Sequence, residues 1–362
     1  RESCLPKTAW PPTSKIEALK AMTPADRRRA IFDGIMNNAM FIIIALVIIY
    51  VAIKNPRFLS IPSLVNIISL TAAKLPIALG VGGCIILAGT DISAGRQVGL
   101  AACISAGLQL TTNKLFPGLQ ILPIPVVLLC VLVACAMVGF VNGFFMAKFK
   151  LHPFIVTLST QLIVYGLVLL FMQLGTNGGQ TLSGMSEGYR NFIIKPLLTL
   201  KTSSGPVTVP RYVLYSTIIT AIVWVIWNKT AFGKNMYAVG SNEEAANVSG
   251  VNVSKTIILV FVMAGMLYGI TGFMDAARIA SVNATTGLNY EADAIAACVI
   301  GGISFVGGIG KVSGAIIGVL LLQIIFAGLN FLSVDANYLY IVKGLIILIA
   351  CSIDMRKYLV RK

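Results

Sequence analysis

The sequence has little of what most enzyme active sites need: among 362 residues there are 13 Asp and Glu and one histidine, His152. No H-E-x-x-H motif is present, and a lone loop histidine predicts neither a Ser-His-Asp array nor a zinc site. The Walker A nucleotide motif is also missing, because Gly310-Lys311 is followed by Val312 and Phe305 stands where the first glycine belongs. We therefore expect no catalytic residues, no cofactor and no P-loop nucleotide site.

Disulfide and metal frameworks are equally unsupported. The cysteine count is seven, an odd number, and six of these cysteines lie inside apolar stretches. Their spacing matches no metal-ligand pattern, so we interpret them as packing residues and predict no metal site.

Charge is scarce as well, since 11% of residues are charged and 57% are hydrophobic. A soluble fold of this composition would expose large apolar patches. The apolar runs are continuous and do not alternate, which favours helices over a barrel. Because one span needs about 20 apolar residues, we predict an all-α polytopic membrane protein with about ten transmembrane helices over residues 39–353. Some should be broken, and the span at 61–88 should be broken or kinked, because Pro76 precedes three glycines.

Basic residues are distributed unequally between the predicted loops. With both termini cytoplasmic, 18 of the 28 Lys and Arg residues face the cytoplasm and 8 lie in outer loops. The positive-inside rule favours this orientation. Residues 1–38 and 354–362 are then cytoplasmic tails. The scattered basic residues, with no aromatic-interleaved patch, argue against a nucleic-acid partner.

The polar segment at 228–254 separates long apolar runs. Within it, SNEEAANVSG predicts a short helix that Ser241 and Glu244 cap as a capping box and that ends at Gly250. Two helical turns are not stable alone in water, so a partner protein or the membrane surface must hold them. Small residues at 245, 246 and 249 would allow close approach. The predicted contact residues are Gly240, Ser241, Asn242, Glu243, Glu244, Ala245, Ala246, Ser249 and Gly250.

A second candidate site begins at GTDISAGRQVGLAAC. Asp91 or Ser93 should cap the helix that follows, and a sharper hypothesis makes Asp91 and Arg96 a charge pair that gates a pathway. DISAGRQVGLAAC and DAIAACVIGG show weak similarity five spans apart, which is compatible with a five-plus-five inverted repeat. The candidate pathway or gate residues are Asp91, Ser93, Arg96, Gln97, Asn283, Glu291 and Asp293.

Four stretches carry a resemblance to a known family: GTDISAGRQVGLAA, GFVNGFFMAKFKLHPFIVTLST, NKTAFGKNMYAVGSNEEAANVSGVNV and NYEADAIAACVIGGISFVGGIG. In this order they resemble the permease subunits of bacterial monosaccharide ABC importers, the ribose, xylose and galactose group, from about residue 39 onward. SAGRQVGLAA and YEADAIAACVIGG are most similar to the galactose and methyl-galactoside permeases. The spacing from Glu244 to Gly250 is similar to the EAA loop, although no I-x-L-P follows.

This resemblance implies an inner-membrane permease that imports a monosaccharide. It also implies a second permease copy forming a homodimer, a cytoplasmic ABC ATPase, and a periplasmic sugar-binding protein that could dock on the outer loop at 175–211. A permease for a pentose or nucleoside remains an alternative. An ion-coupled carrier needs intramembrane ionisable sites, whereas the acids here gather at span ends. A membrane enzyme would need Asp91, Glu291 and Asp293 assembled into an acid/base pair.

Overall fold

The computed structural model describes residues 39–359, apart from residues 117, 176 and 203–204. The chain forms two compact units, Arg1–Leu46 and Val47–Lys362. Of the first unit, the structure describes only the beginning of helix α3 (Ala39–Lys54). The tail predicted at 1–38 lies outside the described residues. Every element after α3 belongs to the second unit.

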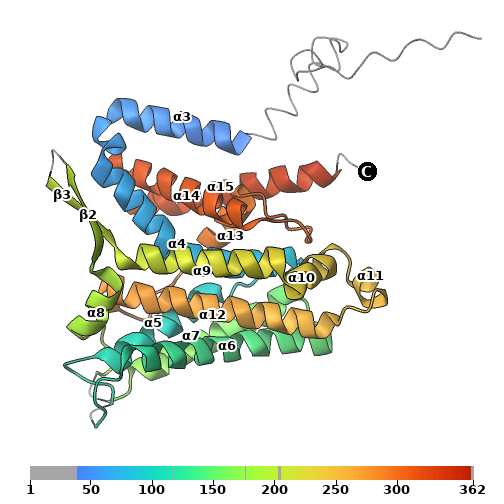
Figure 1. The fold of residues 1–362 in the computed structure, drawn as a ribbon, viewed down its shortest axis with the longest axis horizontal. Coiled ribbons are helices and arrows are strands. Elements are labelled where there is room, and N and C mark those ends of the chain that lie inside the picture. Colours follow the sequence, from blue (N-terminus) through green and yellow to red (C-terminus); the bar gives the residue numbers. More distant parts are fainter. Residues whose placement is uncertain (1–38, 117, 176, 203–204, 360–362) are drawn as a thin grey trace, which may run out of the picture. The chain divides into compact units, whose positions relative to one another are not determined.

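Helices make up most of the second unit, with two small β-ladders between them (Figure 1). After α3 the elements are η1 (Pro56–Leu59), α4 (Ile61–Ile86), α5 (Ala94–Gln109), α6 (Ile124–Phe149), α7 (Pro153–Met172), β1 (Leu182–Ser183), α8 (Glu187–Ile194), β2 (Pro196–Thr202), β3 (Gly205–Pro210), α9 (Arg211–Lys229), α10 (Ala231–Ser241), α11 (Glu243–Val248), α12 (Val253–Ile279), β4 (Ser281–Val282), α13 (Tyr290–Ile300), α14 (Val312–Phe331) and α15 (Ala336–Leu359).

The prediction of a polytopic helical membrane protein is confirmed. Within the described residues, 6 helices are long and apolar enough to cross a membrane: α4, α6, α7, α9, α12 and α14. The other predicted spans are also helices, but α5 and α13 have only 16 and 11 residues. Large apolar side chains on α6 and α7 are exposed, including Leu129 at 61% and Leu162 at 66%, which suits contact with lipid.

The predicted break in the 61–88 span is wrong, because α4 runs through Pro76 as one helix to Ile86. Proline removes only its own N–H, and the surrounding helices hold α4 on several sides. The glycines that follow serve close packing: a Cβ on Gly80 would lie 2.6 Å from the Tyr268 ring of α12. The last helix, α15, continues to Leu359, beyond the predicted end of the last span at 353.

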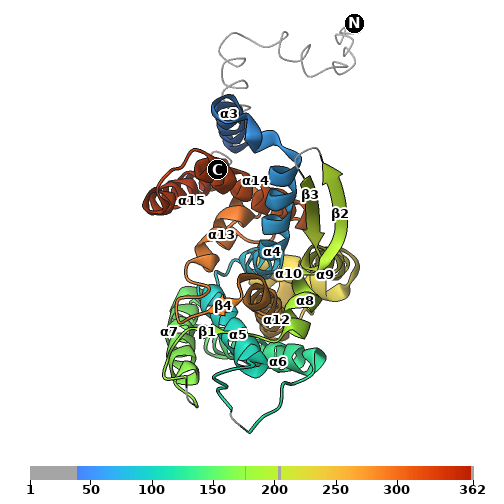
Figure 2. The same cartoon turned by 90° about the vertical axis from the view of Figure 1, so that its left-hand side faces the viewer.

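Helices α4 and α12 form the centre of the second unit. α5, α6 and α7 lie on one side of this pair, and α13, α14 and α15 lie on the other (Figure 2). α12 packs against α5 and α6, while α4 packs against α13 and α14. α5 contacts α7 just as α13 contacts α15. This correspondence between the two sides is compatible with a five-plus-five inverted repeat.

The two ends of the helices carry different structures (Figure 1). At one end are α10 and α11. At the other are α8 and the antiparallel hairpin of β2 and β3. Here β1 pairs with β4, matching Leu182 to Val282, so the long segment at 175–211 is joined to the segment that follows α12.

Candidate functional site

Two consecutive caps shape the polar segment between α9 and α12. Thr230 caps α10, accepting a hydrogen bond from the Gly233 amide at 3.1 Å. Asn242 caps α11, its Oδ1 accepting from the Ala245 amide at 2.9 Å. The predicted capping box at Ser241 is wrong, because Ser241 is the last residue of α10 and Asn242 is the residue that leaves helical geometry. Gly250, with φ of +85°, follows the end of α11 as predicted.

The exposed surface of α11 is acidic with one apolar tip. Glu243, Glu244 and Ala245 are exposed, and Val248 is 89% exposed. Ala246, by contrast, is only 4% exposed and packs with valines of the same chain. The expectation that Ala246 forms part of an open small-residue face is therefore wrong. A partner could reach the acids and Val248, while Ala246 anchors the helix.

Helix α10 lies against two other segments of the chain. A Cβ on Gly240 would meet the Ile86 carbonyl oxygen and lie 2.9 Å from the Gly308 amide nitrogen. The Gly308 amide donates to the Ile86 carbonyl at 2.8 Å. The Tyr237 hydroxyl donates to the Gly310 carbonyl at 3.0 Å. Burial raises the pKa of Tyr237, so the hydroxyl keeps its proton at neutral pH.

Asp91 belongs to a fully buried hydrogen-bond network. Its Oδ1 accepts from the Ser93 hydroxyl at 2.5 Å and from the Ser93 amide at 3.0 Å. The Ser93 hydroxyl in turn accepts from Gln97 at 2.9 Å and from Asn142 of α6 at 3.0 Å. These four side chains are 0% exposed, so in this conformation they hold the start of α5 against α6.

The predicted charge pair between Asp91 and Arg96 is not formed. Arg96 points to another segment: it donates to the Ala284 carbonyl at 3.1 Å. Its guanidinium carbon also lies 4.2 Å from the centroid of the Tyr165 ring on α7. Arg96 lies in the first turn of α5 and bonds elsewhere, whereas Asp91 lies before the helix and its Oδ1 is bonded to Ser93.

Two glycines explain the close contact between α5 and the segment before α13. A Cβ on Gly95 would collide with the Glu291 carboxylate and the Gly287 carbonyl. A Cβ on Gly99 would lie 2.5 Å from the Thr286 carbonyl oxygen. The fold thus brings Glu291 to the first turn of α5, beside Arg96.

The remaining predicted residues have structural partners. The Asn283 Oδ1 accepts from the Thr285 amide at 3.0 Å and from the Thr285 hydroxyl at 2.8 Å, which shapes the turn before α13. Asp293 forms an ion pair with Lys343 of α15 at 2.9 Å.

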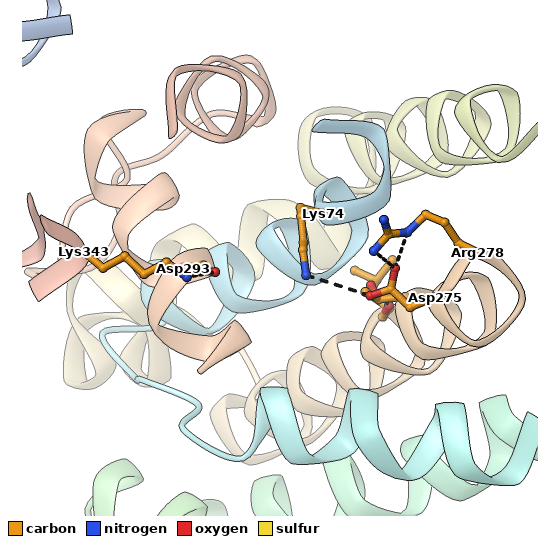
Figure 3. Close-up of polar contacts among 7 residues, drawn as sticks. Lys74, Asp275, Arg278, Asp293 and Lys343 are labelled. Carbon is orange, nitrogen blue, oxygen red and sulfur yellow. Dashed lines mark hydrogen bonds and ion pairs between the residues drawn. The ribbon is translucent and has the colours of Figure 1, made fainter. Parts of the chain in front are cut away.

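A larger charge cluster joins α4 to α12 (Figure 3). Asp275 is fully buried and pairs with Arg278 at 2.8 Å and with Lys74 at 3.9 Å. The Arg278 Nε also donates to the Asp275 Oδ1 at 2.8 Å. Lys74 is a charge inside a span, and its partner lies 201 positions away in the sequence, too far for local spacing to indicate.

Comparisons with known proteins agree with this architecture. Residues 63–351 match the family model for the permease component of the branched-chain amino acid transport system. The chain belongs to this permease family. It is 41% identical to the galactose/methyl galactoside import permease protein MglC of Haemophilus influenzae, over 91% of this chain and 97% of that protein. It is 38% identical to MglC of Escherichia coli, over 92% and 98%. The ribose import permease protein RbsC of Bacillus subtilis is 34% identical, over 92% and 97%. No solved structure matches.

A permease component of such an importer works with a separate ATPase and a substrate-binding protein, so this family member is a transport subunit and not itself the ATPase. It is a multi-pass protein of the inner membrane. Sequence reasoning missed Asn142 and Tyr165 because each lies in an apolar helix whose pattern indicates only a membrane span. Their polar contacts depend on α6 and α7 packing against α5.

Proposed function

We propose that this permease is the transmembrane subunit of an ATP-driven importer that moves a monosaccharide, galactose or methyl galactoside, into the cytoplasm. The similarity to MglC proteins supports the choice of sugar. The helix pair α10 and α11 supports the proposal that import is driven by ATP. It projects at one end of the helices, and α11 exposes two acids and Val248 to a partner.

In this proposal two copies of the chain form a homodimer, and α11 of each copy docks on the cytoplasmic ATPase. Both termini then lie in the cytoplasm, as the distribution of basic residues favours. The opposite end, where β1 and β4 join the 175–211 segment to the segment after α12, is the docking surface for the loaded periplasmic binding protein.

For the pathway we retain Arg96, Asn283, Glu291 and Asp293, which lie around the start of α13. Asp91, Ser93 and Gln97 stay in the proposal as residues that lie behind these four, because the side chains of all three are 0% exposed in this conformation. Such a lining offers few groups for holding a sugar tightly, so selection lies mainly in the binding protein.

A pentose permease is the second candidate, and the similarity to RbsC supports it. An ion-coupled carrier is disfavoured because Asp275 and Asp293 already have basic partners. A nucleoside permease has no comparable observation in its favour.

The test uses the complete permease in sealed vesicles. Permease alone should show negligible uptake, and adding ATPase and ATP should not suffice. Adding binding protein loaded with labelled galactose should restore ATP-dependent import, because only a ligand that binds the two conformations unequally can shift them. Labelled ribose with its own binding protein separates the two sugar candidates. Rapid saturable uptake by the permease alone, driven by the sugar gradient, would mean that the protein is a facilitator.

A further inference from the structure

We propose that Gly240, at the end of α10, is a positioning residue that transmits the movement of the docked ATPase into the membrane-embedded helices. This inference rests on the proposed function, and goes beyond it by naming the contact through which α11 acts. Gly240 was among the predicted ATPase contacts, but it is buried, so in this scheme the ATPase does not touch it.

The contact joins three segments that are distant in sequence. The backbone of Gly240 lies against the Ile86 carbonyl, at the last residue of α4. It also lies against Gly307 and Gly308, in the segment that connects α13 to α14. Ile86 and Gly308 are themselves bonded, the Gly308 amide donating to the Ile86 carbonyl at 2.8 Å. One backbone carbonyl therefore stands at the junction of all three segments.

Only glycine permits this junction. A Cβ on Gly240 would overlap the Ile86 carbonyl, and a Cβ on Gly308 would overlap the Ser241 hydroxyl. Gly307 and Gly308 also have positive φ angles, +89° and +67°, which suit glycine. With backbone against backbone, no flexible side chain is available to absorb a displacement of α10.

Each of the two receiving segments is closed by a backbone hydrogen bond. Beyond α4, the Gly89 amide donates to the Cys84 carbonyl at 3.0 Å, and this turn leads directly into the buried Asp91 network. In the other segment, the Ser304 amide donates to the Ile309 carbonyl at 3.1 Å. Residues 301–303 separate this closed turn from the end of α13, and the Ile303 amide before it donates to the Cys298 carbonyl of α13 at 2.9 Å, so the turn can pass a shift to α13.

Tyr237 supplies a second connection one helical turn earlier on α10. Its hydroxyl donates to the Gly310 carbonyl at 3.0 Å. α10 is thereby tied to the glycine segment at two points, Gly240 and Tyr237. Movement of α11 then reaches α4 and α13 together, and these helices carry Lys74 and the Glu291 region.

The experiment reconstitutes the full complex with the variants Gly240→Ala and Tyr237→Phe. Gly118→Ala is the matched control, because a Cβ there meets nothing within 4 Å. We expect Gly240→Ala to leave ATPase copurification unchanged, to lower sugar import roughly tenfold or more, and to abolish the stimulation of ATP hydrolysis by loaded binding protein. Tyr237→Phe, which adds no atoms, should lower import and stimulation by a smaller factor.

The readouts separate this inference from the proposed function. If wild-type import needs no ATPase, the proposed function fails. If import is ATP-driven but Gly240→Ala retains wild-type import and stimulation, the inference is overturned. Loss of ATPase copurification by Gly240→Ala would make Gly240 part of the docking surface and would also overturn it. Should Gly240→Ala not elute as a folded dimer, Tyr237→Phe decides: unchanged stimulation contradicts the inference.

Discussion

The ammonium group of Lys74 on α4 lies 2.7 Å from the centroid of the Tyr290 ring on α13. The same ammonium is 3.9 Å from the buried carboxylate of Asp275 on α12. Lys74 of α4 therefore contacts both α12 and α13 from a largely buried position. A cation in such a place is stabilised by a ring face and a counter-charge together.

Replacing Asp275 with asparagine should destabilise the permease strongly. The change leaves the partly buried Lys74 and Arg278 close together without their shared, fully buried carboxylate, and breaking a buried pair costs about 3–5 kcal/mol. Thermal unfolding of the detergent-purified protein measures the effect as a lowered midpoint.

Glu187→Gln is the control for Asp275→Asn. Glu187 is an exposed acid in the first turn of α8, so its loss changes the net charge equally but removes no buried partner. Its unfolding midpoint should stay near that of the wild type. Equal midpoints for the two variants would show that the Asp275 cluster contributes little to stability.

The arrangement of spans was predictable because continuous apolar runs indicate helices regardless of how those helices pack. Each run identified between residues 39 and 353 is a helix. The pairing of Asp275 with Arg278 follows from local spacing too, because the two residues lie three positions apart on one helix.

Predictions from local sequence patterns failed where two helices compete for one capping residue. They also failed where packing against distant helices decides the conformation or the partner of a residue. Ser241 has the chemistry of a cap, yet α10 extends through it and Asn242 takes the role. Pro76 has the chemistry of a helix breaker, yet neighbouring helices hold α4 together. The partners of Lys74 and Ser93 lie on helices far along the chain, so no sequence spacing points to them.

The exposed tip of α11 should be where the ATPase docks. Val248→Asp should abolish ATPase copurification while the permease still folds, because an exposed side chain is removed from the proposed interface without disturbing the core. Pull-down of the ATPase with tagged permease measures docking, and size-exclusion chromatography measures folding.

Ala246→Arg provides the contrast within the same helix. Ala246 packs against Val239 and Val253, so an arginine there should lower the unfolding midpoint of the permease itself. A Val248→Asp permease that still captures the ATPase as the wild type does would place the docking contact elsewhere.

Both ends of the membrane domain can be assigned to opposite sides by chemical labelling. In a background with the native cysteines replaced, Lys201→Cys on β2 and Glu243→Cys on α11 present exposed reporters at the two ends. Intact cells should react with a membrane-impermeant maleimide at position 201 only, and inverted vesicles at position 243 only. Labelling of both positions from the same side would contradict the proposed orientation.

The contact between α5 and the segment before α13 should tolerate no methyl group at Gly99. Gly99→Ala places a Cβ 2.5 Å from the Thr286 carbonyl oxygen, which is backbone and cannot rotate away. Overpacking of this kind costs about 1–3 kcal/mol, so the unfolding midpoint should fall. Gly166→Ala on α7 is the matched control: its Cβ meets nothing within 4 Å. There, alanine should raise helix stability by up to about 1 kcal/mol, because glycine is the poorer helix former.

A double variant, Gly99→Ala with Thr286→Gly, should regain little stability, since the obstructing atom belongs to the backbone. Full recovery in that double variant would show that the Thr286 side chain, and not its carbonyl, causes the clash.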